Sequence, residues 1–356
     1  AYGTIGKAIT AYFDKLNKED GGINGRKIVF ISYDDSYSPP KTVEQIRKVV
    51  ELDKVLMLFQ TLGTPTNTAI HKYVNAKKIP HLFVATGATK WGQPEKFPWT
   101  MGWQPNYQTE ARIYAKYIMD NVSDPKIGIL FQNDDYGKDY VKGLRDGLGA
   151  DADKLIVSEL SYEVSDPTVD SQIITLKNSG ANVFFNVTTP KFAAQSIRKA
   201  HDIGWKPLQL INNVASSIQA VLKKAGLEKS VGIVSSAYLK DPNDSQWDDD
   251  EGIIAWRAWM KTYYPEGNPA NAFNLYGYTA AQTLEQVLRN CGDNLTRENV
   301  MKQAASLTGL ELAGLLPGIT ITTSGTDFRP IEQMQLQKFD GKSWQLFGEI
   351  ISAGTS

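Results

Sequence analysis

The sequence predicts an α/β protein with two doubly wound, Rossmann-like lobes. Short, nearly continuous apolar runs alternate with segments of helical periodicity along most of the 356 residues. Such alternation is typical of parallel strands that are buried on both faces and joined by helical crossovers. The pattern restarts after Asn121, and the chain is longer than an average domain of roughly 150 residues. We therefore expect two lobes.

The first lobe opens with a helix over residues 5–16, where apolar side chains recur at helical spacing. The glycine-rich loop 21–25 follows and leads into an apolar strand at 28–31. The same order then repeats, with helices within 43–50 and 66–74 and strands at 55–59 and 81–84.

The second lobe continues this alternation. We expect strands at 127–131, 155–157, 183–187 and 208–211, separated by helices within 141–148, 169–176 and 192–200. Residues 253–288 are mainly helical and rich in aromatic side chains. Near the end, Met334 and Leu336 alternate with glutamines, and Asp340-Gly341 supplies turn chemistry. A terminal antiparallel hairpin is expected there.

Composition and charge exclude several classes of partner. The formal net charge is −1, and lysine and arginine are scattered along the chain, so we expect no nucleic-acid partner. No apolar run approaches the roughly 20 residues that span a bilayer, and we expect a soluble chain. Cys291 is the single cysteine, which excludes an internal disulfide but leaves the redox compartment open.

The sequence lacks the common signatures of catalysis and metal binding. Its three histidines have no metal-ligand spacing. The acidic segment 241–251 lacks the central glycine and alternating oxygen ligands of an EF-hand, so it fits a solvated loop. No nucleophile elbow, phosphate-binding loop or dinucleotide fingerprint follows a strand. We therefore expect no cofactor, no metal and no enzymatic activity.

Two loops that are rich in glycine and hydroxyl side chains directly follow apolar strands, at residues 61–66 and 85–89. In an open α/β sheet, ligands bind in the crevice beyond the carboxyl ends of the strands. Backbone amides at the start of a helix suit a carboxylate. In the alternative interpretation, the threonines only cap helices and the glycines only permit turns.

Six short motifs resemble one protein family in order and spacing over essentially the whole chain. They are Ala1-Tyr2-Gly3, Gly21-Gly22-Ile23-Asn24-Gly25, Tyr33-Asp34-Asp35, Gly87-Ala88-Thr89, Asp135-Tyr136-Gly137 and Phe339-Asp340-Gly341. The family is that of the branched-chain amino-acid-type (Leu/Ile/Val-binding) solute-binding proteins of ABC transporters. The resemblance implies the type I periplasmic-binding-protein fold, with a three-crossing hinge between the lobes. The N-terminal lobe would comprise 1–102 plus 250–329, and the C-terminal lobe 103–249 plus 330–356.

The resemblance also implies where the protein works. Members of the family lie in the periplasm, bind a small-molecule ligand and deliver it to an ABC permease in the cytoplasmic membrane. We expect the same here, for a monomer. The family has a signal peptide and a first β-strand ahead of the position of Ala1, so we expect both to precede the given chain.

Binding residues carry over where the motifs align. The carboxylate-binding loops of the family resemble Gly63-Thr64 and Gly87-Ala88-Thr89, whose amides and hydroxyls would hold an acid group. The aromatic wall of the family resembles Tyr2, Tyr136 and Phe273. For Tyr136 and Phe273, packing in the core is the alternative role.

This sequence departs from the amino-acid binders of the family at the ammonium site. Those proteins use an acidic side chain and a tyrosine where this sequence has Asn212 and Thr188. A buried ammonium without a carboxylate is costly, whereas Asn212 and Asn213 suit hydroxyl, amide, ether or carbonyl groups. Residues 327–330 and the Gly-Thr-Pro loop resemble a subgroup linked to aromatic acids. The sequence thus favours a carboxylic acid with an uncharged, aromatic body.

The leading hypothesis is a solute-binding protein of an ABC importer for such a small organic acid. The alternatives are a binding protein for branched-chain or other hydrophobic amino acids, a ligand-sensing receptor ectodomain or regulator, and a hydrolase on the same scaffold. A receptor or regulator would carry a transmembrane helix or a DNA-binding segment beside the lobes. A hydrolase would need a nucleophile and a base in one cleft.

Overall fold

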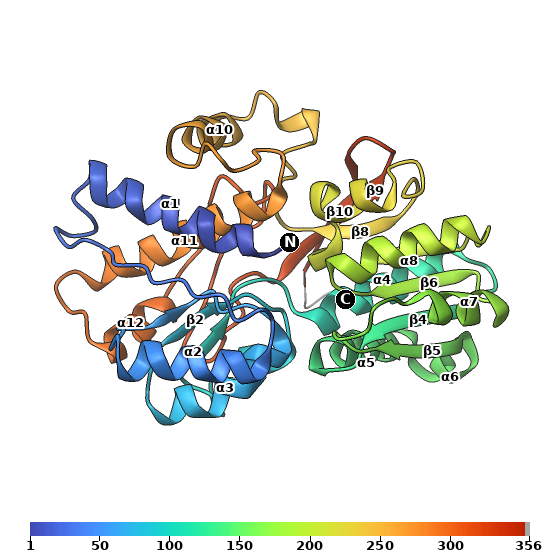
Figure 1. Cartoon of the computed structure of the whole chain (residues 1–356), viewed down its shortest axis with the longest axis horizontal. Coiled ribbons are helices and arrows are strands. Elements are labelled where there is room, and N and C mark those ends of the chain that lie inside the picture. The colour runs from blue at the N-terminus through green and yellow to red at the C-terminus, as the bar shows by residue number, and fades with distance from the viewer. Residues whose placement is uncertain (353–356) are drawn as a thin grey trace.

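The computed structural model describes residues 1–352 and shows two lobes, each with its own sheet (Figure 1). One sheet has three parallel strands in the order β1-β2-β3, which are β1 (Leu58–Phe59), β2 (His81–Val84) and β3 (Thr100–Gly102). The other sheet has seven strands in the order β10-β9-β8-β7-β6-β4-β5. These are β4 (Ile127–Gln132), β5 (Ile156–Tyr162), β6 (Val183–Val187), β7 (Leu208–Ile211), β8 (Val234–Ala237), β9 (Gln333–Phe339) and β10 (Trp344–Ser352).

Helices flank both sheets (Figure 1). Beside the three-stranded sheet lie α1 (Gly3–Glu19), α2 (Pro39–Glu51), α3 (Thr64–Ala76), α11 (Ala272–Cys291) and α12 (Arg297–Ala304). Beside the seven-stranded sheet lie α4 (Tyr107–Asn121), α5 (Asp135–Leu148), α6 (Ala152–Leu155), α7 (Asp170–Asn178), α8 (Pro190–Asp202) and α9 (Lys223–Ala225). The remaining helix, α10 (Glu251–Tyr263), lies at the top of Figure 1. No helix of the described chain is long and apolar enough to cross a membrane.

The larger sheet has the parallel core that its apolar runs predict. Strands β5, β4, β6, β7 and β8 run parallel, and β9 and β10 add an antiparallel pair at one side. Every residue of β6 is buried, in agreement with a strand covered on both faces. The turn of the terminal hairpin is fixed by Asp340, whose Oδ1 accepts the amides of Lys342 and Ser343 at 2.8 and 2.9 Å.

The chain passes between the two sheets three times, as the expected hinge requires. It leaves the first lobe between β3 and α4, returns between β8 and α11, and crosses again between α12 and β9. The residue boundaries of the lobes, 1–102 with 250–329 and 103–249 with 330–356, stay a prediction.

The strand expected at 28–31 is absent from the described structure. Its first residue, Ile28, bonds to the Asn17 side chain instead, which accepts from the amide and donates to the carbonyl at 2.7 Å each. Val29 is 83% exposed. Residues 28–31 have no regular secondary structure and pair with no strand among residues 1–352.

The strand expected at 55–59 is shorter than predicted. The Arg297 guanidinium donates to the carbonyls of Val55 and Leu56 at 2.8 and 3.1 Å, so these groups are not available to a neighbouring strand. Only the last two residues of the run pair with β2 and form β1. An apolar run becomes a strand only where its backbone finds a free edge.

Candidate ligand-binding site

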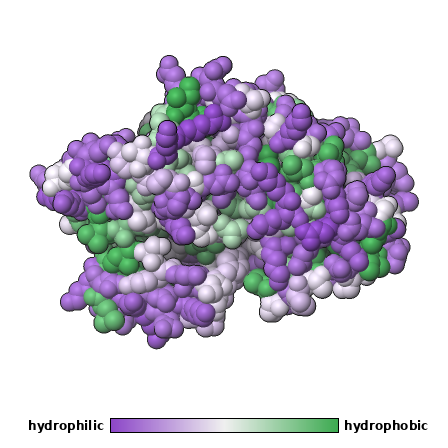
Figure 2. All heavy atoms as spheres, turned by 45° about the horizontal axis from the view of Figure 1, so that its top comes forward, coloured by the Kyte–Doolittle hydropathy of each residue, from purple (hydrophilic) through white to green (hydrophobic). Residues whose placement is uncertain are grey.

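A cavity of about 110 Å³ lies between the two lobes and is lined from both. Figure 2 shows a furrow between the lobes on one face, with mostly hydrophilic residues on either side. The first lobe contributes α1, α11 and the loops that follow β1 and β2. The second lobe contributes the segments that follow β4, β6, β7 and β8. These loops stand at the carboxyl ends of parallel strands, where open α/β sheets bind ligands.

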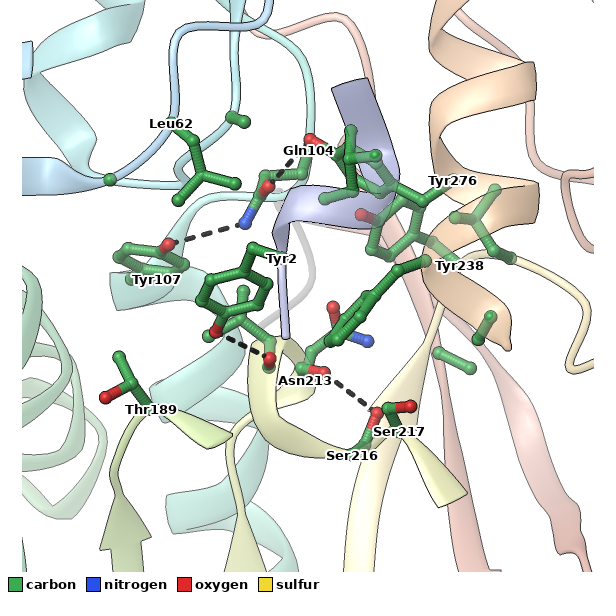
Figure 3. A pocket seen from close by; sticks show the side chains of 18 of the residues that line it. Tyr2, Leu62, Gln104, Tyr107, Thr189, Asn213, Ser216, Ser217, Tyr238 and Tyr276 are labelled. Atoms are coloured by element: carbon green, nitrogen blue, oxygen red, sulfur yellow. Dashed lines mark hydrogen bonds between the residues drawn. The ribbon is translucent and has the colours of Figure 1, made fainter. Parts of the chain in front are cut away.

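Tyrosine side chains form much of the cavity wall. They are Tyr2, Tyr37, Tyr107, Tyr136, Tyr238 and Tyr276. Gln104 links two of them, because it donates to Tyr107 Oη at 3.4 Å and accepts from Tyr276 Oη at 3.2 Å (Figure 3). Burial raises the pKa of all six phenols. They therefore present neutral hydroxyl groups to a ligand.

The hydroxyl of Tyr136 is buried without a hydrogen-bond partner in the described chain. Its ring packs edge-on against Tyr107 and Tyr140, with centroids 5.4 and 5.6 Å away. The Asp134 carboxylate accepts a hydrogen bond from the backbone amide of Tyr136 at 2.9 Å and so fixes the backbone of Tyr136. A buried hydroxyl that lacks a partner costs about 1–3 kcal/mol. An acceptor on a ligand would remove this cost.

The start of α3 supplies backbone donors to the first-lobe side of the cavity. Gly63 precedes the helix with a φ of 97°, and a Cβ there would lie only 2.5 Å from the Tyr37 ring. Pro65 has no N–H, and the amides of Thr64 and Thr66 come before the first helical acceptor. Neither amide bonds to another group within residues 1–352. The N-terminus of a helix with such amides attracts anions.

The hydroxyl of Thr64 borders the cavity and contacts the hydroxyl of Thr86. The neighbouring Thr86 hydroxyl accepts the Trp91 indole N–H at 3.1 Å and the Ala88 amide at 3.2 Å. The Thr86 hydroxyl lies 2.5 Å from Thr64 Oγ1, and either hydroxyl can be the donor in this contact. When Thr86 donates to Thr64, the proton of Thr64 is available to an acceptor in the cavity that this residue lines.

The loop of residues 212–217 forms the second-lobe floor of the cavity (Figure 3). The backbone amide of Asn213 donates to Glu110 at 2.7 Å, and its side-chain amide donates to the Ser236 carbonyl at 2.8 Å. The Ser216 hydroxyl closes the loop by donating to the Asn213 carbonyl at 2.8 Å. The floor therefore presents neutral polar groups in a fixed arrangement.

Asn212, the first residue of this loop, and Thr188 are buried and do not line the cavity. The Asn212 side-chain amide donates to the carbonyls of Asn186 and Thr188 at 3.1 and 3.0 Å. The Thr188 hydroxyl donates to Asn186 Oδ1 at 2.7 Å. These bonds engage the side-chain donors of both residues, so neither is free to bind a ligand acceptor.

Lys240 and Asp241 are the charged residues that border the cavity. The Lys240 ammonium pairs with Asp250 at 2.8 Å. Asp241 Oδ1 accepts the backbone and side-chain amides of Asn243 at 2.7 Å each, and burial raises the pKa of the Asp241 carboxyl. The segment 241–251 therefore differs from the solvated loop that its composition predicts, because these contacts fold its first residues against the cavity.

The structure brings six of the eleven predicted binding residues to the cavity, namely Tyr2, Gly63, Thr64, Tyr136, Asn213 and Phe273. Gly87 and Ala88 line a smaller hollow beside it. Thr89 lines neither, since its amide donates to Asp139 at 2.6 Å and its hydroxyl to Asn106 at 3.2 Å. Contact of these residues with a ligand stays a prediction.

Sequence reasoning missed several cavity residues, above all Tyr238 and Tyr276. Tyr276 stands one helical turn after Phe273 on α11, so helical spacing was a usable signal. Tyr238 follows β8, which was not recognised as a strand because two serines interrupt its apolar run. No cluster of three or more metal-ligating side chains occurs in the part of the chain that the structure describes.

Comparison with known proteins agrees with the fold. A family profile described as periplasmic binding protein matches residues 3–343. The Leu/Ile/Val-binding protein homolog 1 of Brucella abortus is 26% identical over 298 residues, which are 83% of this chain and 75% of the relative.

Solved structures share the whole fold. A branched chain amino acid ABC transporter protein from Thermus thermophilus with bound valine aligns with a TM-score of 0.86, at 16% identity over 98% of this chain and 91% of that one. A solute binding protein from R. palustris in complex with benzoate aligns with a TM-score of 0.80, at 18% identity over 99% and 94%.

The fold and the cavity define a two-lobed ligand-binding protein of type I architecture, as the sequence predicts. The chain belongs to the periplasmic binding protein family. Its resemblance to the Leu/Ile/Val-binding branch is confirmed by the Brucella relatives. The aromatic-acid subgroup stays a prediction.

Proposed function

We propose that this protein is the periplasmic solute-binding component of an ABC importer and that it binds a small organic acid with an aromatic body. The observation that carries the proposal is the cavity, which joins unpaired amides at the start of α3 to a wall of tyrosines from both lobes. Membership of the periplasmic binding protein family supports the binding role. The benzoate complex from R. palustris is a protein of the same fold that holds an aromatic acid.

The carboxylate of the ligand would lie against α3. The amide and the hydroxyl of Thr64, which lines the cavity, supply two donors on this side. The partial positive charge at the helix N-terminus adds to their attraction for an anion. The unpaired hydroxyl of Tyr136 supplies a donor from the other lobe. Bonds from both lobes to one ligand favour the closed arrangement.

The rest of the cavity suits an uncharged, flat body. The rings of Tyr2 and Phe273 stand 5.1 Å apart, and Ile5 and Leu62 add aliphatic surface. Aromatic walls bind a ring through offset or edge-on contacts. An engineered apolar cavity of about 150 Å³ holds benzene, and the space here, about 110 Å³, is smaller, so it favours a small ligand over a large one.

The proposed cycle consists of binding, closure and delivery. Ligand shifts the two lobes from an open to a closed population, and the permease in the cytoplasmic membrane accepts the ligand from the closed form. The cycle contains no covalent step and uses no cofactor or metal. In the proposal the protein acts as a monomer and has no nucleic-acid partner.

A hydrophobic α-amino acid is the second candidate ligand, and Asp241 is the observation that favours it. This carboxyl group borders the cavity and would pair with a ligand ammonium, for which Asn212 and Thr188 offer no charge. The Thermus thermophilus protein, which has the same fold, holds valine.

Mass spectrometry of the ligand released from freshly purified protein tests the proposal directly. Calorimetry with benzoate, phenylacetate, leucine and valine then ranks the candidates. We expect an aromatic acid to bind and the amino acids not to bind. Tight binding of leucine or valine without binding of either aromatic acid contradicts the proposal. Asp241→Asn separates the two cases, because it should abolish amino-acid binding and leave acid binding unchanged or stronger.

A further inference from the structure

Glu110 is a buried carboxylate behind the cavity floor and does not itself line the cavity. It lies on α4 and is 2% exposed. Its Oε1 accepts the Asn213 amide and the Tyr114 hydroxyl, both at 2.7 Å, and its Oε2 accepts the Tyr140 hydroxyl at 2.6 Å. Donors from α4, α5 and the loop after β7 therefore converge on one side chain.

Hydrogen bonds alone stabilise this carboxylate, because no cationic group pairs with it within the described residues. The titratable groups that face it are Tyr107, Tyr114, Tyr140 and Tyr238, and burial keeps the pKa of each phenol above its usual range. Burial raises the pKa of Glu110, while the bonds from its donors oppose this shift. Hydrogen bonds to an ionised acceptor are roughly twice as strong as neutral ones.

The bond from Asn213 connects Glu110 to the floor of the cavity. The next residue in the loop, Val214, offers the carbonyl that accepts the Tyr2 hydroxyl at 2.9 Å. Ser216 folds back onto the Asn213 carbonyl at 2.8 Å. A displaced Asn213 would therefore disturb both the floor and a hydrogen bond between the lobes.

We propose that Glu110 is a positioning residue, which holds the loop of residues 212–217 in the conformation that forms the cavity floor. Its effect on ligand affinity is indirect and rests on the proposed binding function. The competing role is general stabilisation of the α4–α5 pair through the bond to Tyr140. The first role depends on the hydrogen bond from the Asn213 amide, and the second on the hydrogen bond from the Tyr140 hydroxyl.

Hydrogen exchange on the full chain, measured by mass spectrometry, separates these roles. Glu110→Ala removes the acceptor of the Asn213 amide, Glu110→Gln makes that bond neutral, and the matched control Tyr140→Phe leaves it intact. We expect exchange in residues 212–217 to be roughly 10–150-fold faster in Glu110→Ala, the range for the loss of a hydrogen bond to a charged acceptor. Glu110→Gln should show a smaller acceleration and Tyr140→Phe none. Affinity for benzoate, used as the probe, should fall in the same order.

Equal acceleration in all three variants overturns the proposal, as does unchanged exchange in a folded Glu110→Ala protein. If Glu110→Ala does not fold, the difference in hydrogen exchange between Glu110→Gln and Tyr140→Phe decides between the two roles. Thermal unfolding then compares how much stability each of these variants loses. A wild-type protein that fails to bind benzoate contradicts only the proposed ligand class, because exchange reports the position of the loop without any ligand.

Discussion

The hydroxyl of Tyr2 donates a 2.9 Å hydrogen bond to the carbonyl of Val214, which joins the start of α1 to the cavity floor of the other lobe (Figure 3). A second link is the ion pair between Lys90 and Asp135 at 2.6 Å. Both links require the lobes to be close together. The structure thus has its lobes closed, and the first link uses a side chain that also lines the cavity.

Tyr2→Phe should destabilise the closed arrangement of the two lobes but preserve the aromatic wall of the cavity. The ring contact with Phe273 remains, and only the hydrogen bond to Val214 is lost. A neutral hydrogen bond contributes about 0.5–1.5 kcal/mol, so ligand affinity should fall roughly 2–10-fold. Calorimetry measures the change in affinity. X-ray scattering at low ligand concentration should show that the variant is less compact than the wild type. Unchanged affinity would mean that this bond adds nothing to closure.

Thr64→Val should weaken the binding of an acid ligand by about 1–3 kcal/mol, because it removes a hydrogen-bond donor from the cavity. Thr64→Ser keeps the hydroxyl and should restore most of the affinity. Thr89→Val is the second control, since the Thr89 hydroxyl bonds to Asn106 and does not line the cavity. Calorimetry of the three variants checks this order. An equal loss in Thr89→Val would place the acid group closer to residues 87–89 than to α3.

Strands that are buried on both faces could be predicted from the sequence alone. The bounds of β2, β6 and β7 coincide with those expected from their apolar runs. The strand β8 was not predicted, because Ser235 and Ser236 interrupt its apolar pattern. In the structure these serines lie beside the Tyr114 hydroxyl, at 3.5 and 2.9 Å, so a buried polar network hides the strand.

The candidate site could be predicted in part from the sequence motifs. Tyr2 and Tyr136 stand in such motifs and line the cavity. The position of Thr89 depends on Asp139, which lies 50 residues further along the chain and accepts its amide. Local sequence contains no signal for a contact of this kind. The same holds for Glu110, whose bond to Asn213 spans 103 residues.

Tyr136→Phe should affect binding and stability in opposite ways. Without ligand, the hydroxyl is buried and unpaired in the described chain, so its removal should leave the melting temperature unchanged or raise it. With an acid ligand, the loss of a donor to a charged acceptor should cost about 1.5–3 kcal/mol of affinity. Thermal shift and calorimetry on one preparation test both effects. A lower melting temperature of the free protein would show that the hydroxyl has a structural partner.

His71 and His81 should make the protein sensitive to acid. Burial lowers the pKa of His71 from 6.5 to about 4 and that of His81 to about 3. Both are neutral when folded, whereas the unfolded chain takes up protons below pH 6.5. The stability that they confer is complete above pH 6.5 and falls as pH drops toward 4, by up to about 1.4 kcal/mol per pH unit for each.

His71→Phe tests this dependence, because it keeps the stack on Phe97 at 3.6 Å and removes a ring nitrogen that has no partner among residues 1–352. The free energy of unfolding, measured with urea from pH 4 to 7, should then vary less with pH. His201→Gln is the control, since the His201 side chain is 50% exposed. An unchanged slope in His71→Phe would show that His71 takes up its proton over the same pH range in the folded and unfolded protein.

The close approach of α4 and α5 depends on Gly143. A Cβ at this position would lie 2.4 Å from the Gln108 carbonyl oxygen and 2.9 Å from the Ala111 Cβ. Gly143→Ala should therefore destabilise the protein by about 1–3 kcal/mol, although alanine is the better helix former by about 1 kcal/mol. Gly3→Ala on α1 is the control, because its Cβ would meet nothing within 4 Å and should be neutral or stabilising. Urea unfolding measures both variants, and a stabilised Gly143→Ala would mean that the two helices can move apart without loss of packing.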